Sequence, residues 1–337
     1  MTNFDAKVAL VLSGGNALGS YQAGVYEALH AGGLSPEWIV GSSIGAINGA
    51  IIAGNPPADR IEKLSRFWRA GTAGSIFDLP YADTIRRTAA VNATLLTGRP
   101  GLFAPIGSLG PWGSAHHNGD TPSFLDSAQL ESTLETLVDF DLLNAGPVRF
   151  CACAVDIETG EEVVFDTSRE RVNARHVRAS ASLIPMFASV GIAGRSYVDG
   201  GFSANLPLDP VLAEPGAERL LCIAADLLPK QARPPATLGE SISRAQDLMF
   251  ACQSRRTIAR WRSQYTHDAV LGAHHVALAR LAYTDQEAEV AGKAMDFSPA
   301  SARQRWDAGI ADAAKLLQAL PTASTSEPGL TILNGFD

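Results

Sequence analysis

Two adjacent serines, Ser42 and Ser43, stand between glycines in the stretch VGSSIG, residues 40–45. A serine hydroxyl becomes an effective nucleophile only when a neighbouring base removes its proton. Residues 41–45 match the pattern G-x-S-x-G with Ser43 in the central position, and the flanking glycines of this pattern leave room for a tight strand-to-helix turn. Ser42 lacks this context, because the residue two positions before it is Val40. The spacing therefore selects Ser43 as the candidate nucleophile.

A glycine-rich turn, SGGNALGS, precedes this pattern at residues 13–20. Its uncovered backbone N–H groups and the helix that follows are suited to holding an anion. A Walker-type phosphate loop needs a lysine where the chain has Ser20, and a dinucleotide fingerprint needs a glycine where it has Asn16. The remaining use is an oxyanion hole, in which N–H donors stabilise the negative oxygen of a tetrahedral intermediate.

The base that would activate the serine has two kinds of candidate. His267, His274 and His275 have the chain order of a Ser–Asp–His triad, but none of the seven histidines sits in a local motif. Asp199 ends a short predicted strand in SYVDGG, and the two glycines after it allow a sharp turn. Its carboxylate would then lie at the end of the strand, where open α/β sheets bind their ligands. The structural alternative is a turn aspartate that bonds its own backbone.

The segments around these residues predict a parallel α/β sheet. Residues 7–13 form a short apolar run typical of a strand buried on both faces, and residues 20–33 repeat apolar side chains at helical spacing. The same two patterns recur at residues 37–54. Because a parallel crossover usually contains a helix, this order indicates a βαβ unit. Four later segments extend the predicted sheet to about residue 228: VRFCACAVDI, EEVVFDT, SYVDGG and RLLCIAADLL.

Two regions depart from this pattern. Residues 70–125 are rich in Gly, Pro, Ser and Thr and predict a long irregular insertion, whose apolar side chains favour a covering loop over disorder. Those side chains are Leu102, Phe103, Ile106, Leu109 and Trp112. Residues 231–337 predict a helical extension packed on a catalytic domain of residues 1–230. A basic end of the first helix of this extension is interpreted as a solvated face rather than a lipid-binding one; it comprises Arg255, Arg256, Arg260 and Arg262.

Composition narrows the class of protein. The 337 residues are 46% hydrophobic and 18% charged, which fits a folded enzyme, and the net charge of −8 gives no support to nucleic-acid binding. Cys151, Cys153, Cys222 and Cys252 form neither a disulfide framework nor a CxxC pair, so we expect no metal and no cofactor. We see no secretory leader and no apolar run of about 18 residues. We expect a cytoplasmic protein whose contact with a membrane is at most peripheral. The sequence does not predict its oligomeric state.

Taken together, the motifs resemble the patatin-like phospholipase family. The similarity includes the text around them (LSGG…YQAGV, VGSSIGAING, ASASLIPMF…YVDGGFSANLPL) and spans about residues 7–214. It implies a three-layer α/β/α fold with a mainly parallel central sheet, and a hydrolase that cleaves acyl esters of lipids with a Ser–Asp dyad and no histidine. By position, Ser43 is the nucleophile and Asp199 the base. The implied oxyanion hole consists of the backbone N–H groups of Gly14, Gly15 and Asn16.

The dyad makes physical sense if Asp199 is buried. A carboxylate with an ordinary pKa near 4 is a weak base for a serine hydroxyl. Burial would raise that pKa, and oxyanion donors would offset the alkoxide-like charge. The implied mechanism is acylation of Ser43 by an ester, followed by hydrolysis by a water that Asp199 deprotonates.

Two positions depart from the family pattern. Asn16 stands where a third glycine is usual, and an asparagine tolerates a positive φ better than most residues, so the turn can persist. Leu18 stands where the family often has a cation, so a preference for phospholipid headgroups is not implied. The alternative hypotheses are an esterase or thioesterase acting on soluble or polymeric hydroxyacyl substrates, and a non-catalytic relative that binds lipid.

Overall fold

Strand β1 (Lys7–Leu12) lies in the middle of the central sheet, between β2 (Trp38–Ser42) and β9 (Leu220–Asp226). The structure is a computed structural model, which describes residues 6–69, 83–106, 121–216, 218–320 and 327–333. Beyond β9 follow β10 (His275–Ala282) and β11 (Gly329–Leu333), and beyond β2 lies β5 (Arg149–Asp156). All these neighbours pair in parallel, so their carboxyl ends meet at one edge.

The sheet becomes antiparallel past β5. Strand β8 (Arg195–Asp199) pairs with β5, and β7 (Val190–Ile192) pairs with β8. Strand β6 (Glu162–Asp166) also pairs with β5, which gives nine strands within the described residues. A separate short ladder joins β3 (Ala104–Pro105) to β4 (Leu125–Asp126).

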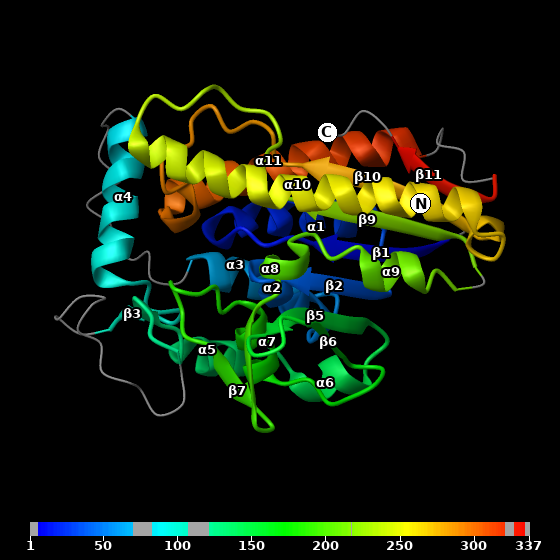
Figure 1. Cartoon of the computed structure of the whole chain (residues 1–337), viewed down its shortest axis with the longest axis horizontal. Coiled ribbons are helices and arrows are strands. Elements are labelled where there is room, and N and C mark those ends of the chain that lie inside the picture. The colour runs from blue at the N-terminus through cyan, green and yellow to red at the C-terminus, as the bar shows by residue number, and fades with distance from the viewer. Residues whose placement is uncertain (1–5, 70–82, 107–120, 217, 321–326, 334–337) are drawn as a thin grey trace.

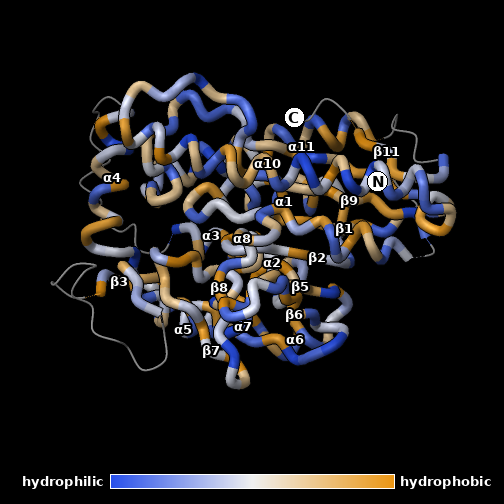
Figure 2. Tube along the Cα trace, in the orientation of Figure 1, coloured by the Kyte–Doolittle hydropathy of each residue, from blue (hydrophilic) through white to orange (hydrophobic). Residues whose placement is uncertain are grey.

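Alternate residues of β1 face two different hydrophobic cores, because successive side chains of a strand point to opposite faces. Leu10 and Leu12 belong to the core with α1 (Ser20–Ala31) and α2 (Ile44–Ala53), while Ala9 and Val11 belong to the core with α9 (Asp209–Ala213) and α10 (Leu238–His267). Figure 1 shows α10 crossing in front of the strands and α1 behind them. The strands and α2 carry much of the hydrophobic colour at the centre of Figure 2. The molecule therefore has three layers.

Helix α11 (Pro299–Ala319) lies against α1 with the two backbones in close approach. A Cβ on Gly24 would lie 1.9 Å from the carbonyl oxygen of Trp306, and one on Gly309 would lie 2.1 Å from that of Tyr21. The remaining helices of the described residues are α3 (Arg60–Arg69), α4 (Asp83–Thr97), α5 (Gln129–Leu137), α6 (Phe140–Ala145), α7 (Ala174–Ser180), α8 (Gly201–Ala204) and the 3-10 turns η1 (Asn16–Gly19), η3 (Leu271–Ala273) and η4 (Lys293–Met295).

The fold class predicted from the sequence is confirmed: a three-layer α/β/α arrangement with a mainly parallel sheet, followed by a largely helical C-terminal region. The prediction that the sheet stops near residue 228 is wrong. Strands β10 and β11 lie beyond that point and extend the same sheet. Four of the eight residues of β10, HVALARLA, are alanine or arginine. Strands are enriched in β-branched and aromatic residues instead, so the sequence of β10 gives a weak strand signal.

The insertion at residues 70–125 is not wholly irregular, because it contains α4. The buried face of α4 carries Arg86, Arg87 and Thr94 beside two apolar residues, so no apolar stripe marks this helix in the sequence. Leu102 and Phe103 are buried in the main core, and Ile106 is half-buried. Leu109 and Trp112 lie outside the described residues. Among the helices that the structure describes, none has the length and apolar character needed to cross a membrane.

Candidate active site

Ser43 lies at the turn between β2 and α2 and has a φ of 56° with a ψ of −126°. A residue other than glycine rarely adopts this conformation, so the turn is strained. A Cβ on Gly41 would lie 2.4 Å from the backbone nitrogen of Ala46, and one on Gly45 would lie 2.1 Å from the carbonyl oxygen of Leu12. The two glycines of the G-x-S-x-G pattern therefore have the steric role that the pattern predicts.

The two neighbouring serines have different surroundings. Ser42 is the last residue of β2 and is fully buried, and its Oγ has no hydrogen-bond partner among the described residues. Ser43 lines a cavity of about 320 Å³. The backbone N–H of Ser43 is held by Ser180, since it donates to the carbonyl oxygen at 3.1 Å and to Oγ at 3.2 Å. Of the pair, only Ser43 reaches the cavity.

Asp199 lines the same cavity from the end of β8. The register of the sheet explains why, because Cys153 of β5 pairs with Ser42 and the next residue, Ala154, pairs with Asp199. Asp199 is 2% exposed. Its Oδ1 accepts the N–H of Gly201 at 2.7 Å, while Oδ2 has no hydrogen-bond partner within the described part of the chain. The serine and the carboxylate thus face one cavity from either side of β5.

Burial raises the pKa of the Asp199 carboxyl to about 7, although the nearby Ser43 hydroxyl and the hydrogen bond from the Gly201 N–H lower it in part. The Ser43 hydroxyl is therefore close enough to affect the carboxylate, yet no hydrogen bond of ordinary length and angle joins the two side chains. Contacts between catalytic groups are often long in a free enzyme and tighten when substrate binds. A carboxylate with a pKa near 7 is a stronger base than an ordinary aspartate, and it is about half ionised at neutral pH and largely ionised above it.

The glycine-rich turn forms another wall of the cavity through Gly15 and Asn16. Asn16 has a φ of 50°, the left-handed conformation that asparagine tolerates. The backbone N–H groups of Gly15 and Asn16 donate to no other described residue. Gly14 differs, because its N–H donates to the carbonyl oxygen of Asn205 at 3.0 Å. Two of the three N–H groups expected from the sequence are therefore free to meet an oxyanion, and that of Gly14 is already used.

Two polar residues that our sequence interpretation did not single out hold these turns. The Asn205 Nδ2 donates to the carbonyl oxygen of Gly14 at 3.3 Å, so Asn205 contacts that residue twice. Ser180 donates its hydroxyl to the carbonyl oxygen of Cys153 at 2.6 Å while it accepts the N–H of Ser43. Both residues lie in segments that resemble the family, ASASLIPMF and YVDGGFSANLPL. The similarity of these flanking segments is the sequence feature that could have identified Ser180 and Asn205.

A buried amide network supports the turn from below. The Gln22 Nε2 donates to the carbonyl oxygen of Ser13 at 2.8 Å, and the Asn48 Nδ2 donates to Gln22 Oε1 at 3.0 Å. The Asn48 Oδ1 accepts the indole N–H of Trp68 at 3.1 Å. Because all polar atoms of the network are paired, it fixes the start of α1 against α2.

The rest of the cavity wall is mainly apolar. Its apolar side chains include Ile44, Ile47, Leu102, Phe103, Leu130, Leu183, Met186, Phe187, Leu228, Phe250 and Met295. Such a wall suits a hydrocarbon chain better than a charged group. Leu18, where the resemblance led us to look for a cation, is fully buried in the core instead.

None of the described histidines lines this cavity. His274 precedes β10 and His275 begins it, so both lie at the amino edge of the parallel strands, opposite Ser43. His267 is in the last turn of α10, where its ring contacts the carbonyl oxygen of Ser263 at 2.8 Å. His116 and His117 lie outside the described residues. The described structure thus supplies no histidine for a triad with Ser43.

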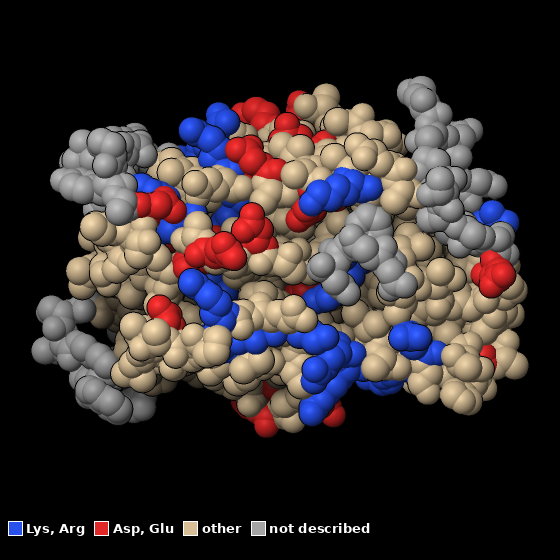
Figure 3. All heavy atoms as spheres, turned by 90° about the horizontal axis from the view of Figure 1, so that it is seen from above, with Lys and Arg blue, Asp and Glu red and all other residues tan. Residues whose placement is uncertain are grey.

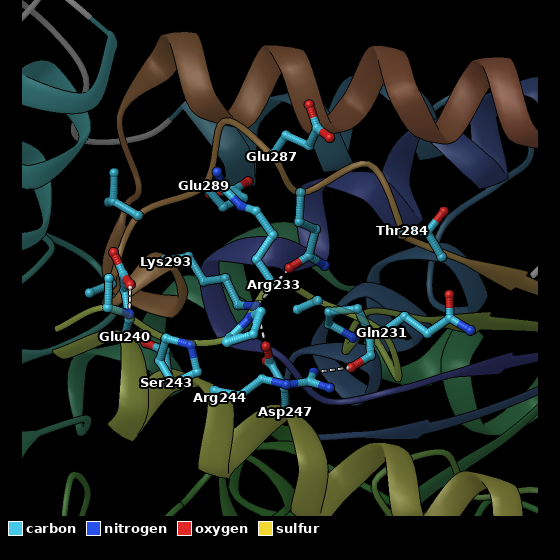
Figure 4. A pocket seen from close by; sticks show the side chains of 18 residues that line it. Gln231, Arg233, Glu240, Ser243, Arg244, Asp247, Thr284, Glu287, Glu289 and Lys293 are labelled. Carbon is cyan, nitrogen blue, oxygen red and sulfur yellow. Dashed lines mark hydrogen bonds and ion pairs between the residues drawn. The ribbon is translucent and has the colours of Figure 1, made fainter. Parts of the chain in front are cut away.

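A second cavity, of about 650 Å³, is lined by charged and polar side chains (Figure 4). Segment 290–295 contributes to both cavities, with Gly292 and Met295 at the Ser43 cavity and Lys293 at the second one. The Lys293 Nζ donates to Asp247 Oδ2 at 2.8 Å and to Gln286 Oε1 at 2.6 Å. No candidate catalytic residue lines this second cavity, and among the described residues no cluster of His, Cys, Asp and Glu is arranged to hold a metal ion.

The family described as patatin-like phospholipase matches residues 10–212, and a model described as patatin phospholipase matches residues 253–328. The chain therefore belongs to the patatin-like phospholipase family. The resemblance inferred from the motifs is confirmed.

Similar proteins include uncharacterized NTE family proteins of Mycobacterium bovis and Mycobacterium tuberculosis, each 26% identical over 228 residues. The match covers 68% of this chain and 51% of each relative, so the chain spans about half their length. The crystal structure of VipD from Legionella pneumophila aligns with a TM-score of 0.46 and 14% identity, over 94% of this chain and 67% of that one.

Proposed function

We propose that the chain hydrolyses carboxylic esters of lipids through an acyl-enzyme on Ser43, with Asp199 as the general base. One observation carries the proposal. A serine on a strained turn and a buried carboxylate whose pKa is raised to about 7 face the same apolar cavity, beside two uncommitted backbone N–H groups.

In the first half-reaction, the Ser43 Oγ attacks the carbonyl carbon of the ester and its proton passes to Asp199. The carbonyl oxygen becomes negative and accepts hydrogen bonds from the N–H groups of Gly15 and Asn16, each worth about 2.7 to 4 kcal/mol in comparable sites. The tetrahedral intermediate then collapses, the C–O bond to the leaving alcohol breaks, and that alcohol takes the proton from Asp199. The product is an acyl ester of Ser43.

In the second half-reaction, Asp199 removes a proton from water, which attacks the acyl-enzyme carbonyl. The same N–H groups stabilise the second oxyanion. Collapse breaks the bond to Ser43 Oγ, which recovers its proton from Asp199, and the carboxylic acid leaves. The carboxylate acts as base and then as acid in each half, which a pKa near 7 favours at neutral pH.

The apolar cavity wall supports an acyl chain as the part of the substrate that is held. Residue 18 is a buried leucine, so this position offers no cation to a phosphate headgroup. We therefore retain an esterase or thioesterase acting on soluble or polymeric hydroxyacyl substrates as the second candidate function. Hydrolysis rates on phosphatidylcholine vesicles, acyl-CoA and short soluble esters distinguish the two, since a lipid hydrolase is expected to favour the vesicles.

The catalytic assignment is tested by covalent labelling with a fluorophosphonate probe. The wild-type chain and the matched control Ser42→Ala are expected to label, and Ser43→Ala is expected not to. Ser43→Ala and Asp199→Asn should each lower kcat/KM on a short p-nitrophenyl ester by at least about 10³-fold while circular dichroism stays unchanged. Labelling of folded Ser43→Ala protein, or full activity of either variant, would refute the assignment.

A further inference from the structure

A row of exposed apolar side chains runs along α10 beside the Ser43 cavity. Leu238, Ile242 and Met249 are 78%, 65% and 61% exposed. Steps of four and seven residues place them on one face of the helix. Ile242 also lines the cavity, so the cavity opens to the surface at this row. We name these three residues the α10 apolar row.

Exposed apolar side chains also border the cavity on other elements. Leu95 of α4 lines the cavity and is exposed, as is its neighbour Leu96. Phe202 of α8 is exposed next to Gly201, whose carbonyl oxygen accepts the side-chain N–H of Gln253 on α10 at 3.2 Å. Apolar side chains that are clustered and uncovered mark a surface for an apolar partner. Two elements that line the cavity, α10 and α4, therefore carry exposed apolar side chains, and α8, which contacts α10, carries another.

Beyond the α10 apolar row the exposed face of the helix becomes basic. Arg256 follows Met249 by seven residues and continues the face of the α10 apolar row, while Arg255 and Arg262 lie about 100 to 120 degrees round the helix from it, and all three are exposed. Arg260 pairs with Asp209, whereas Arg255, Arg256 and Arg262 have no acidic partner among the residues that the structure describes. Figure 3 shows Lys and Arg gathered in a band across the lower half of the view, on the side of the molecule where α10 lies. This local positive charge contrasts with the net charge of −8.

We propose that this face of α10, whose basic end we interpreted from the sequence as solvated, instead docks on an anionic lipid surface and brings the opening of the Ser43 cavity against the membrane. Exposed apolar side chains can insert among the acyl chains of a lipid surface, and exposed arginines near them bind its phosphates. An acyl chain could then enter the cavity from the bilayer beside Ile242 without crossing water. The docking itself does not depend on catalysis, while its use for substrate entry rests on the proposed function.

The docking is tested with Ser43→Ala protein, which leaves the lipid unaltered. In cosedimentation, it should bind phosphatidylcholine vesicles that contain phosphatidylserine more tightly than vesicles without it, and salt should weaken the binding. Adding Leu238→Ser with Met249→Ser should lower the partition coefficient at least tenfold. Replacing Arg255, Arg256 and Arg262 with glutamine should lower it about a hundredfold, at roughly fivefold for each arginine.

Val270→Ser is the matched control, because Val270 is as exposed as the α10 apolar row but lies beyond the end of α10. It should bind vesicles like the parent. In the active chain, Leu238→Ser with Met249→Ser should keep its rate on a short soluble ester, so loss of docking and loss of catalysis are told apart.

Equal binding by the Leu238→Ser, Met249→Ser variant and the parent would overturn the proposal, as would a parent that stays in the supernatant with anionic vesicles at low salt. A parent that is dimeric in solution and becomes monomeric in that variant would instead identify the face as an interface between copies, and would also refute lipid docking.

Discussion

Asp199 is the residue whose environment matters most for the chemistry proposed. An aspartate at the surface would be ionised well below pH 7 and would be a weak base. Burial of Asp199 disfavours the charged form, and the Ser43 hydroxyl and the N–H of Gly201 offset this only in part, so the pKa rises to about 7. The same burial that makes the carboxylate expensive to ionise makes it able to accept the serine proton.

This pKa predicts the pH dependence of the reaction. Asp199 must be ionised to act as base, so kcat/KM on a short p-nitrophenyl ester should fall about tenfold per pH unit below the midpoint and level off above it. The midpoint should lie near pH 7, because burial raises the pKa of Asp199 to about 7. Initial rates between about pH 5 and pH 9 measure it, with circular dichroism to show that the fold persists. A midpoint near the ordinary aspartate value of about 4 would contradict the assigned base.

Much of the candidate site at this scale could be predicted from the sequence, because strained turns leave glycine signatures. Ser43 and Asp199 each stand beside such glycines. The hydrogen bond from the Gly14 N–H to Asn205 could not be predicted, since it depends on two segments almost two hundred residues apart in the chain. A pattern of glycines indicates that N–H groups are exposed by the local backbone, but not which of them another segment uses.

At the scale of elements, the turn between β2 and α2 is the feature under greatest steric constraint. Gly45→Ala would place a methyl group 2.1 Å from the carbonyl oxygen of Leu12, a backbone atom that cannot move without displacing β1. We expect a loss of at least about 2 kcal/mol of unfolding free energy and of most activity. Urea denaturation measures the first and ester hydrolysis the second.

The matched control is Gly191→Ala, because a Cβ at Gly191 meets no atom within 4 Å and its φ is not in the left-handed region. This variant should change the unfolding free energy by less than about 0.5 kcal/mol. If Gly45→Ala were as stable and as active as Gly191→Ala, the close approach of α2 to β1 would not be needed for the serine turn.

Predictability differs among the elements for physical reasons. Four strands are buried on both faces and can be recognised in the sequence as continuous apolar runs: β1, β2, β5 and β9. Helix α4 packs Arg86 and Arg87 inward, where they form ion pairs with Asp83 and Glu289, so its buried face has the composition of a surface. Ion pairs between distant segments leave no periodic apolar pattern in the sequence. Neither α4 nor the segment around Glu289 can therefore be recognised from such a pattern.

At the scale of the whole molecule, the Lys293–Asp247 pair ties the segment that walls the Ser43 cavity to α10. Burial lowers the pKa of Lys293 and raises that of Asp247, so the cost of desolvation outweighs the attraction between the two charges. Lys293→Met alone would leave Asp247 buried without a partner and should cost about 3 to 5 kcal/mol of unfolding free energy.

The double variant Lys293→Met, Asp247→Leu removes both charges and should recover most of that loss, because replacing a buried ion pair with apolar residues is often neutral or stabilising. Urea unfolding of Lys293→Met, Asp247→Leu and the double variant completes a double-mutant cycle, which measures the interaction free energy of the two residues. Additive losses in the double variant would show that the two residues act independently.

The position of β10 and β11 at the outer side of β9 has a consequence for biosynthesis. β9 emerges from the ribosome with β1 and β2 already made, yet its outer neighbour ends only at Ala282 and the helix that covers α1 ends at Ala319. Until then β9 presents an unpaired edge, the kind of surface on which nascent chains associate wrongly. The edge of β9 is thus unpaired while the residues between Asp226 and Ala282 are synthesised, and a nascent chain needs protection from wrong strand pairing during that interval.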